Sequence, residues 1–206
     1  MSSFQIRVLE RAKVLKIAVS PSHLAALKTY AELLQVWNRR INLTALPLDG
    51  WPDATLDRLI FEALVAEPAV RGLSGLWVDL GSGGGTPAIP LAVVSSGLAL
   101  TLTESRGRKA AFLREALRVV PVQGAQVQSR FEDLLRWNRR SVALITCRAV
   151  RIEQTIEVAN HLLGEDGRML FFGSQPVKSI GGLEILDKYA LPCGNAMSVL
   201  GRRRET

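Results

Sequence analysis

One stretch of this chain decides its fold, Leu76-Trp77-Val78-Asp79-Leu80-Gly81-Ser82-Gly83-Gly84-Gly85-Thr86-Pro87. An apolar run ends in an acid, and four glycines then occupy five positions. A short apolar run bounded by glycines is typical of a buried strand that leads into a tight loop and a helix, here at residues 88–95. The stretch therefore predicts the start of a nucleotide-binding α/β unit.

The spacing of the glycines separates two classes of cofactor. Asp79 stands two residues before Gly81, and Gly83 and Gly85 follow at alternate positions. The dinucleotide fingerprint requires a third glycine or alanine where this chain has Thr86. The spacing therefore favours S-adenosylmethionine over NAD, and a nicotinamide oxidoreductase is the weakest alternative function.

Two acids suit that cofactor. Asp79, at the carboxyl end of its strand, can attract the ammonium group of a methionine moiety. Glu104 follows Gly85 by nineteen residues and ends a second apolar run. A carboxylate there can accept hydrogen bonds from both ribose hydroxyls. The alternative is an ordinary strand-loop-helix turn followed by a chance acid.

Length and composition bound the architecture. With 206 residues, 48% of them hydrophobic, the chain can bury a core of its own. We expect one compact unit, with an N-terminal helical extension at residues 1–70 and a catalytic core at residues 71–206. Cys147 and Cys193 show no disulfide pattern and fit a reducing compartment. His23 and His161 are isolated, so no metal site is expected.

The chain carries no charge from Leu80 to Thr103, which raises the question of a membrane span. Glycines, two prolines and a Ser-Ser-Gly break interrupt this segment, so it predicts loop, helix, turn and strand instead. The first twenty residues carry basic side chains among the apolar ones and lack the apolar core of a secretory signal. We therefore expect a cytoplasmic protein without a membrane partner.

Basic residues exceed acidic ones by 26 to 19, a formal net charge of +7. They cluster at Arg39-Arg40, Arg106 to Lys109, Arg139-Arg140, Arg148 with Arg151, and Arg202-Arg203-Arg204. Each phosphate that a protein neutralises adds about 0.7 to 0.9 to the salt slope of binding, so a few such clusters would bind RNA measurably. The alternative is a solvated basic surface. The candidate RNA contacts are Arg39, Arg40, Asn42, Thr44, Arg151, Arg202 and Arg203.

Two of these candidates have a second interpretation. Asn42 and Thr44 lie in a segment where amides and a hydroxyl stand among apolar residues, just after a predicted helix. Such side chains either contact RNA or cap the helix and tie the loop through hydrogen bonds to the backbone. The sequence leaves both interpretations open.

Hydrophobic periodicity and turn residues predict the order of the elements. Helices are expected at 1–19, from Ser20-Pro21 onward, at 53–67 ending before Pro68, and at 88–95, 106–119 and 152–163. Strands are expected at 76–80, 98–103, 125–128, 142–147 and 168–172, with a turn at 164–167, and then at 183–191 and 197–203. This order predicts an α/β fold, a Rossmann-like class I S-adenosylmethionine-dependent methyltransferase. Its mixed seven-stranded sheet would end in an antiparallel hairpin and carry the N-terminal helical extension.

Two further positions fall at strand ends where ligands bind in such sheets. Phe131 and Glu132 follow the third strand, where they could hold an adenine. A compatible alternative is a helix N-terminus with Ser129 as cap and Glu132 completing a capping box. Arg148 ends the fourth strand beside the topological switch point, and its alternative is a structural ion pair.

The chain resembles the bacterial small-subunit ribosomal RNA guanine-N7 methyltransferase G family, also called glucose-inhibited division protein B, over almost its whole length. The segments that carry the resemblance are 37–45, 79–92, Glu104-Ser105 with Arg108-Lys109 and Phe112-Leu113, and Cys147-Arg148-Ala149. The chain departs from the family at Leu59 and Ala63, where relatives tend to have His and Ser, and at Phe172, where relatives often have Lys.

The resemblance implies a cofactor site and a substrate. Contacts to S-adenosylmethionine are implied at Gly81, Thr86, Phe131 with Glu132, and Arg148, alongside Glu104. The implied substrate is a guanine in a decoding-region loop of 16S rRNA, methylated within or near the small ribosomal subunit by a monomer. A methyltransferase for another substrate and a non-catalytic basic RNA-binding protein with a degenerate cofactor site remain alternatives.

The chemistry requires little acid or base catalysis. Guanine N7 carries an exposed lone pair and no proton, so it can attack the sulfonium methyl directly. Holding the two atoms about 3 to 3.5 Å apart and aligned can contribute about 7 to 11 kcal/mol. The sequence accordingly names no catalytic base.

Overall fold

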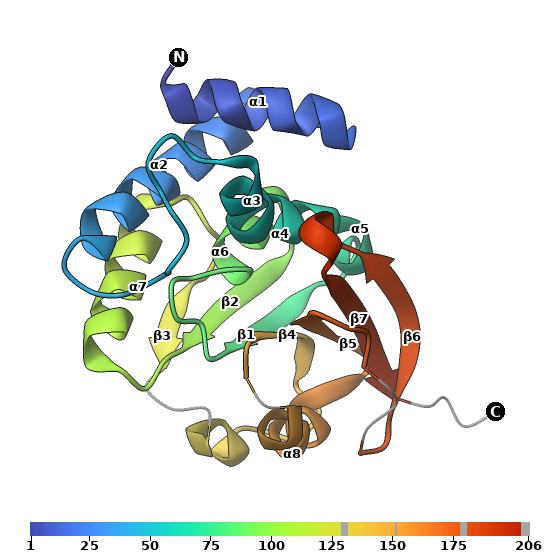
Figure 1. Ribbon diagram of the computed structural model, residues 1–206. Helices are drawn as coiled ribbons and strands as arrows, with labels where there is room; N and C mark the ends of the chain where they lie inside the picture. The colour runs from blue at the N-terminus through green and yellow to red at the C-terminus, as the bar shows by residue number, and fades with distance from the viewer. Residues whose placement is uncertain (129–131, 151, 178–180, 203–206) are drawn as a thin grey trace.

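The computed structural model describes residues 1–128, 132–150, 152–177 and 181–202. Its centre is one seven-stranded sheet with the strand order β3-β2-β1-β4-β5-β7-β6 (Figure 1). The strands are β1 (Gly75–Leu80), β2 (Leu98–Thr103), β3 (Gln126–Gln128), β4 (Val142–Arg148), β5 (Leu163–Gly173), β6 (Leu183–Ala190) and β7 (Ala196–Arg202). Strands β1 to β5 pair in parallel, and β7 pairs antiparallel with both β5 and β6. The α/β fold with its C-terminal antiparallel hairpin is therefore confirmed.

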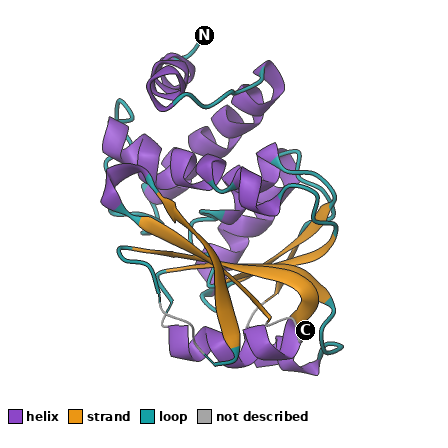
Figure 2. Ribbon diagram, turned by 90° about the vertical axis from the view of Figure 1, so that its right-hand side faces the viewer, coloured by secondary structure: helices purple, strands orange, loops and turns teal. Residues whose placement is uncertain are grey.

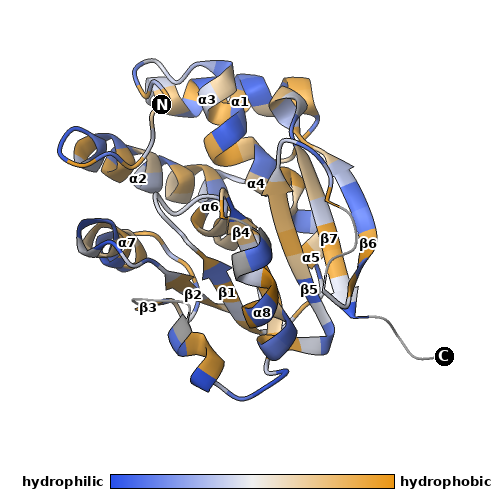
Figure 3. Cartoon of the chain, turned by 60° about the horizontal axis from the view of Figure 1, so that its bottom comes forward, coloured by the Kyte–Doolittle hydropathy of each residue, from blue (hydrophilic) through white to orange (hydrophobic). Residues whose placement is uncertain are grey.

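Helices cover both faces of the sheet, and Figure 2 shows the sheet between the two helical layers. One layer holds α1 (Ser3–Leu15), α2 (Pro21–Asn38), the helical segment 53–70, α6 (Ala88–Val94) and α7 (Gly107–Val119). The other layer holds the 3-10 helix η2 (Glu132–Arg136) and α8 (Ile152–Leu162). Hydrophobic and hydrophilic residues share the surfaces of helices such as α1 and α8 (Figure 3), as expected of elements with one buried face.

Strand alternation assigns the polar residues of the sheet to one face. In β1, Val78 and Leu80 pack against the α8 layer, whereas Trp77 packs against the layer that contains α2. Successive side chains of a strand point to opposite faces, so Asp79 shares the face of Trp77. By the same rule Thr146 and Arg148 of β4 share that face, because Leu144 packs there. The carboxyl ends of the central strands thus present their polar groups to the layer that contains α2.

The first two helices begin at the caps that the sequence supplies. Ser20 accepts a hydrogen bond from the His23 backbone N–H at 3.1 Å, directly before Pro21 at the first position of α2. Ser2 and Gln5 form a capping box at α1. The expected helix start at Ser20-Pro21 is confirmed.

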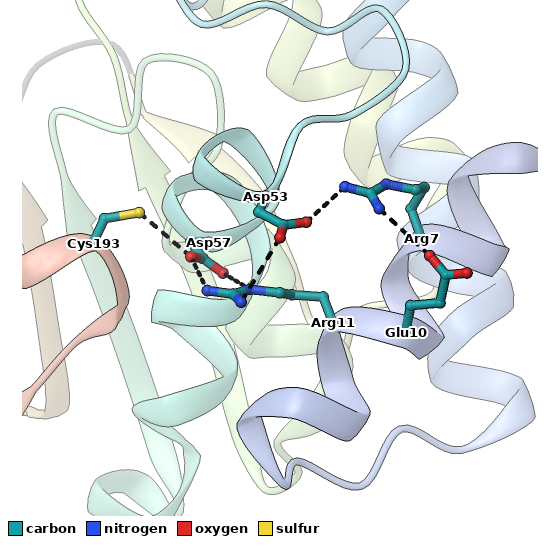
Figure 4. Close-up of polar contacts among 6 residues, drawn as sticks. All are labelled: Arg7, Glu10, Arg11, Asp53, Asp57 and Cys193. Carbon is teal, nitrogen blue, oxygen red and sulfur yellow. Dashed lines mark hydrogen bonds and ion pairs between the residues drawn. The ribbon is translucent and has the colours of Figure 1, made fainter.

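Helix α1 is held to the rest of the fold by ion pairs (Figure 4). The guanidinium of Arg11 donates to both carboxylate oxygens of Asp57, at 2.8 and 2.6 Å. Arg7 reaches Asp53 at 2.6 Å, and the Cys193 thiol donates to Asp57 at 3.4 Å from the turn between β6 and β7. The hydrophobic core is shared as well, since it runs from Phe4 to the sheet.

Two expected boundaries were wrong. The helical segment 53–70 consists of α3 (Asp53–Leu56), the π-helix η1 (Asp57–Phe61), α4 (Glu62–Val65) and α5 (Glu67–Val70). It continues past Pro68, which sits in the first turn of α5, where a missing N–H costs little. Strand β5 includes the expected turn at 164–167, because a register shift lets Leu163 pair with Val142 before Arg168 pairs with Leu144.

Candidate active site

The glycine loop after β1 has the backbone that the sequence predicts. Gly81 and Gly85 have φ values of +73° and +87°, which L side chains rarely adopt. A Cβ on Gly81 would lie 2.6 Å from the Val150 side chain, and one on Gly85 would lie 2.6 Å from the Ile89 side chain. At both positions glycine is therefore favoured, because it adopts the positive φ and leaves room for the neighbouring side chain.

The loop is tied to β2 by two side chains that the sequence analysis did not identify. The Thr103 hydroxyl donates to the Asp79 carbonyl at 2.8 Å and accepts from the Gly81 N–H at 3.1 Å. The Ser82 hydroxyl donates to the same carbonyl at 3.2 Å and accepts from the Thr103 N–H at 3.1 Å. These bonds fix where the loop leaves the sheet.

The buried Tyr30 of α2 holds the loop from the helical side. Its hydroxyl donates to the Gly84 carbonyl at 2.6 Å, and burial raises the pKa of this phenol. Tyr30 stands at a core-facing position of α2, and nothing in its sequence context signals this contact. A helix of the N-terminal region thus helps to shape the glycine loop.

Glu104 lies against the loop, as the sequence predicts. One carboxylate oxygen accepts from the Gly83 N–H at 3.1 Å, and the other accepts from the Arg106 N–H at 2.8 Å. A carboxylate has about four lone-pair sites, so both oxygens can still accept from hydroxyl groups of a ligand. The fixed carboxylate at the carboxyl end of β2 is suited to a ribose.

Asp79 is buried, with one carboxylate oxygen paired and one unpaired. The Thr146 hydroxyl donates to Oδ1 at 2.5 Å, whereas Oδ2 has no hydrogen-bond partner among the described residues. Burial is the main cause that raises the pKa of Asp79 to about 6, against the opposing effect of hydrogen bonds and of Arg148. The cost of burying this carboxylate therefore exceeds the favourable effect of its hydrogen bonds and of the Arg148 charge.

Arg148 is held by the helical segment 53–70. Its guanidinium donates to Glu62 at 2.6 Å and to the Arg58 carbonyl at 2.7 Å, and lies 3.4 Å from the Thr86 hydroxyl. The group also lies over the Phe172 ring, 5.2 Å from its centroid. Burial lowers the pKa of Arg148 to about 10, although Glu62 opposes this shift. The structural ion pair that the sequence left open is thus present, yet within the described ranges Nε of Arg148 has no hydrogen-bond partner.

Glu62 is a further residue of this site that sequence reasoning missed. It is fully buried and accepts hydrogen bonds from Arg58 and from Asn195 as well as from Arg148. The spacing of Arg58 and Glu62 is that of a helical ion pair, which is the one local signal for it. The family departures at Leu59 and Ala63 flank Glu62 and are themselves buried.

The residues present fit S-adenosylmethionine. Among the described residues, the buried side-chain polar atoms without a partner are Asp79 Oδ2 and Arg148 Nε. One is an acceptor on a carboxylate and the other a donor on a guanidinium, and each charge acts on the pKa of the other group. The ammonium and carboxylate groups of a methionine moiety are the complementary pair.

A cavity of about 450 Å³ opens at the carboxyl ends of β4 and β5. Its lining includes Arg58, Val150, Phe171, Phe172 and Asn195. Phe172, which the sequence marks as a departure from the family, therefore contacts both this cavity and the Arg148 guanidinium. Open α/β sheets bind their ligands at this edge.

The structure separates the predicted RNA residues into groups. Arg39, Arg40 and Asn42 are exposed near the end of α2. Thr44 is part of the loop structure, because its backbone N–H donates to Asn38 Oδ1 at 3.0 Å and its hydroxyl accepts from the Leu46 N–H at 3.1 Å. For Thr44 the capping interpretation therefore describes the contacts.

Arg202 lies away from the glycine loop. Its guanidinium donates to the Leu163 carbonyl at 2.9 Å and to the Asn160 carbonyl, both at the start of β5 and the end of α8. Because β7 runs antiparallel to β5, this position is at the opposite edge of the sheet from the end of β4. The structure does not bring Arg202 together with Arg39 and Arg40.

Several predicted residues cannot be placed. Phe131, Arg151 and Arg203, together with Ser129, lie outside the described residues, and only the backbone of Glu132 is described, in η2. Within the described ranges, no three His, Cys, Asp or Glu side chains gather into a group that could hold a metal ion. In the same part of the chain, no helix is long and apolar enough to cross a membrane.

Comparisons with known proteins identify the family. The family model for GidB, rRNA small subunit methyltransferase G, matches residues 23–181. The ribosomal RNA small subunit methyltransferase G of Xanthomonas oryzae pv. oryzae is 38% identical over 162 residues, which cover 77% of this chain and 73% of that protein. The protein of the same name from Anaeromyxobacter dehalogenans is 28% identical and covers 98% of this chain and 97% of its own length.

A solved structure supports the fold alone. The SAM-dependent methyltransferase from Aquifex aeolicus superposes with a TM-score of 0.55 at 10% identity, covering 71% of this chain and 92% of that one. The match of the family model over most of the chain, with relatives above 30% identity, is decisive for the family. This chain belongs to the rRNA small subunit methyltransferase G family.

Proposed function

We propose that this chain transfers the methyl group of S-adenosylmethionine to N7 of a guanine in 16S rRNA of the small ribosomal subunit. The observation that carries the proposal is the pair of buried, unpartnered atoms of opposite charge, Asp79 Oδ2 and Arg148 Nε, beside the glycine loop. In a family of rRNA methyltransferases, this pair suits the methionine part of the cofactor.

Glu104 and the glycine loop provide the remaining contacts to the cofactor in this proposal. Glu104 accepts the ribose hydroxyls, and the backbone at Gly81, Gly83 and Gly85 approaches the methionine part closely. Thr86, whose hydroxyl lies 3.4 Å from Arg148, joins this end of the site. Phe131 and Glu132, which follow β3, hold the adenine in this proposal.

The residues of this chain position the target guanine and exclude water from the reacting atoms. The cofactor supplies a methyl group on a positively charged sulfur when it is bound. The target guanine enters the cavity at the ends of β4 and β5, where Phe172 provides an apolar wall. Alignment of N7 with the methyl group is the main catalytic contribution, worth about 7 to 11 kcal/mol in favourable cases. No side chain has to remove a proton from N7.

The proposal includes the partner of the protein, its location in the cell and the roles of the two parts of the chain. The partner is 16S rRNA or the small subunit, and the protein acts as a cytoplasmic monomer without a membrane partner. Residues 1–70 form the helical extension and residues 71–206 form the methyltransferase core. Tyr30 is a contact through which the extension supports the core, because its hydroxyl donates to the Gly84 carbonyl.

Methyl transfer to isolated subunits tests the proposal. Purified protein is incubated with tritiated S-adenosylmethionine and small subunits that lack the modification, with large subunits and free guanosine as control substrates. We expect label in 16S rRNA alone and strand cleavage at one guanine after borohydride and aniline treatment. Label in large subunits alone or in guanosine alone contradicts the substrate.

Cofactor binding is tested separately by calorimetric titration with S-adenosylhomocysteine. The wild-type chain should bind, whereas Gly83→Val should not, because a β-branched side chain is strained at φ +53° and the Gly83 N–H bonds Glu104. RNA binding by a wild-type chain that gives no heat with S-adenosylhomocysteine would instead indicate a non-catalytic RNA-binding protein.

A further inference from the structure

A second hollow lies on the cofactor side of the molecule, between α2 and α7. These helices lie side by side (Figure 1) and pack through Trp37 and Phe112, whose ring centroids are 5.9 Å apart. The hollow, here called the α2–α7 groove, has a volume of about 310 Å³. It is lined by Val36, Trp37, Arg40, Ile41, Arg108 and Ala111.

The chain segments that border the α2–α7 groove are connected to the glycine loop. Helix α7 begins shortly after Glu104, whose carboxylate bonds the backbone of both Gly83 and Arg106. On the other side, a Cβ on Gly84 would lie 3.3 Å from the Leu43 carbonyl, in the loop that follows α2. The groove and the proposed cofactor site therefore share the chain segments that border them.

The lining combines an apolar floor with two available cations. Val36, Ile41 and Ala111 are apolar, and Trp37 is partly exposed. Arg40 and Arg108 are both exposed, and neither forms an ion pair within the described part of the chain. None of the described residues that line the groove is acidic. This arrangement differs from the paired arginines elsewhere on α7, such as Arg118 with Glu115.

We propose that the α2–α7 groove binds one nucleotide of single-stranded RNA next to the target guanine. The base packs on the apolar floor beside Trp37, and its phosphate lies between Arg40 and Arg108. Aromatic and apolar surface with flanking cations is the usual chemistry of single-strand binding. The net charge of +7 favours a polyanion. The inference rests on the proposed function, because it concerns the same RNA substrate.

Matched double variants test this site. Arg40→Gln with Arg108→Gln removes two charges at the groove, and Lys28→Gln with Arg114→Gln removes two charges from the same two helices outside it. Binding of a fluorescein-labelled single-stranded RNA dodecamer is followed by anisotropy over a series of salt concentrations. We expect the groove variant to bind about tenfold more weakly and to lower the salt slope by about 0.7 to 1.4, while the control changes little.

A third variant tests the base-binding floor without changing the charge. Ala111→Phe fills the groove, so RNA affinity and the KM for small subunits should worsen while S-adenosylhomocysteine still binds. Equal RNA affinities of the groove and control variants, or an Ala111→Phe variant that binds RNA like wild type, overturn the inference. Such a result is expected if the groove binds an acidic peptide instead of RNA, or if it binds nothing. Methyl transfer by the wild-type chain tests the proposed function separately. Wild type can methylate 16S rRNA even if the groove variants bind RNA as well as the control variant does.

Discussion

The Thr146 hydroxyl donates to Asp79 Oδ1 at 2.5 Å across neighbouring strands, and the direction of this bond is set by a third residue. The indole N–H of Trp77 donates to the same hydroxyl at 2.9 Å, so the hydroxyl hydrogen is left for the carboxylate. One carboxylate oxygen is thus satisfied inside the protein. The other, Oδ2, has no hydrogen-bond partner in the part of the chain that the structure describes.

The first prediction concerns the stability of the ligand-free protein. Asp79 ionises near pH 4 when unfolded and at about 6 when folded, so between these values the folded chain binds more protons. The free energy of unfolding should therefore fall as pH rises from 4 to 6, by about 2 to 3 kcal/mol. Urea unfolding of wild type and Asp79→Asn at several pH values measures this, because the variant lacks the slope. Parallel curves for the two proteins would contradict the raised pKa.

The second prediction concerns cofactor affinity. An ammonium group favours the ionised form of Asp79, so affinity for S-adenosylhomocysteine should rise with pH up to about 6 and level off near pH 7. Calorimetric titration at pH 5, 6, 7 and 8 measures the profile. Asp79→Asn should bind at least tenfold more weakly at pH 7 and show no such rise. An identical profile in the variant would assign the titration to another group.

The third prediction concerns the buried ion pair. Glu62→Gln leaves the Arg148 guanidinium in a buried position without its charged partner. Removal of one member of a buried pair costs about 3 to 5 kcal/mol, which urea unfolding would measure. The matched control is Glu115→Gln, which breaks an exposed pair with Arg118 and should change stability little. Equal losses in both variants would show that Glu62 does not stabilise Arg148.

The fourth prediction concerns the glycine loop. Gly81→Ala places a Cβ at φ +73° and 2.6 Å from the Val150 side chain, so it should cost more than about 1 kcal/mol and weaken cofactor binding. Gly107→Ala is the control, because it meets no atom within 4 Å at the start of α7 and should stabilise by about 0.4 to 1 kcal/mol. Thermal unfolding compares the two. Adding Val150→Ala to Gly81→Ala should recover part of the loss, and no recovery would exclude the steric contact.

Much of the fold could be predicted from the sequence because its signals are local. The apolar run before Gly81 predicts β1, and the glycines predict the loop that the φ values confirm. Ser20 with Pro21 predicts the start of α2 for the same reason. The helix expected to end before Pro68 shows the limit, because a proline also fits the first turn of a new helix.

The partners of the site residues could not be predicted, because they come from distant parts of the chain. Arg148 could be placed at a strand end from the sequence, but only packing brings Glu62 to its guanidinium and Phe172 beneath it. The sequence indicates only that Tyr30 is a core residue of α2, and the fold brings its hydroxyl to the Gly84 carbonyl.

The sequence by itself thus determined the family, the order of helices and strands along the chain and the position of the glycine loop, since these depend on spacing along the chain. Only the tertiary structure decided that Asp79 is buried with one oxygen unsatisfied and that Arg40 and Arg108 flank one groove. Burial and the meeting of distant residues arise when the layers pack, and they set the pKa values and free donors on which binding depends.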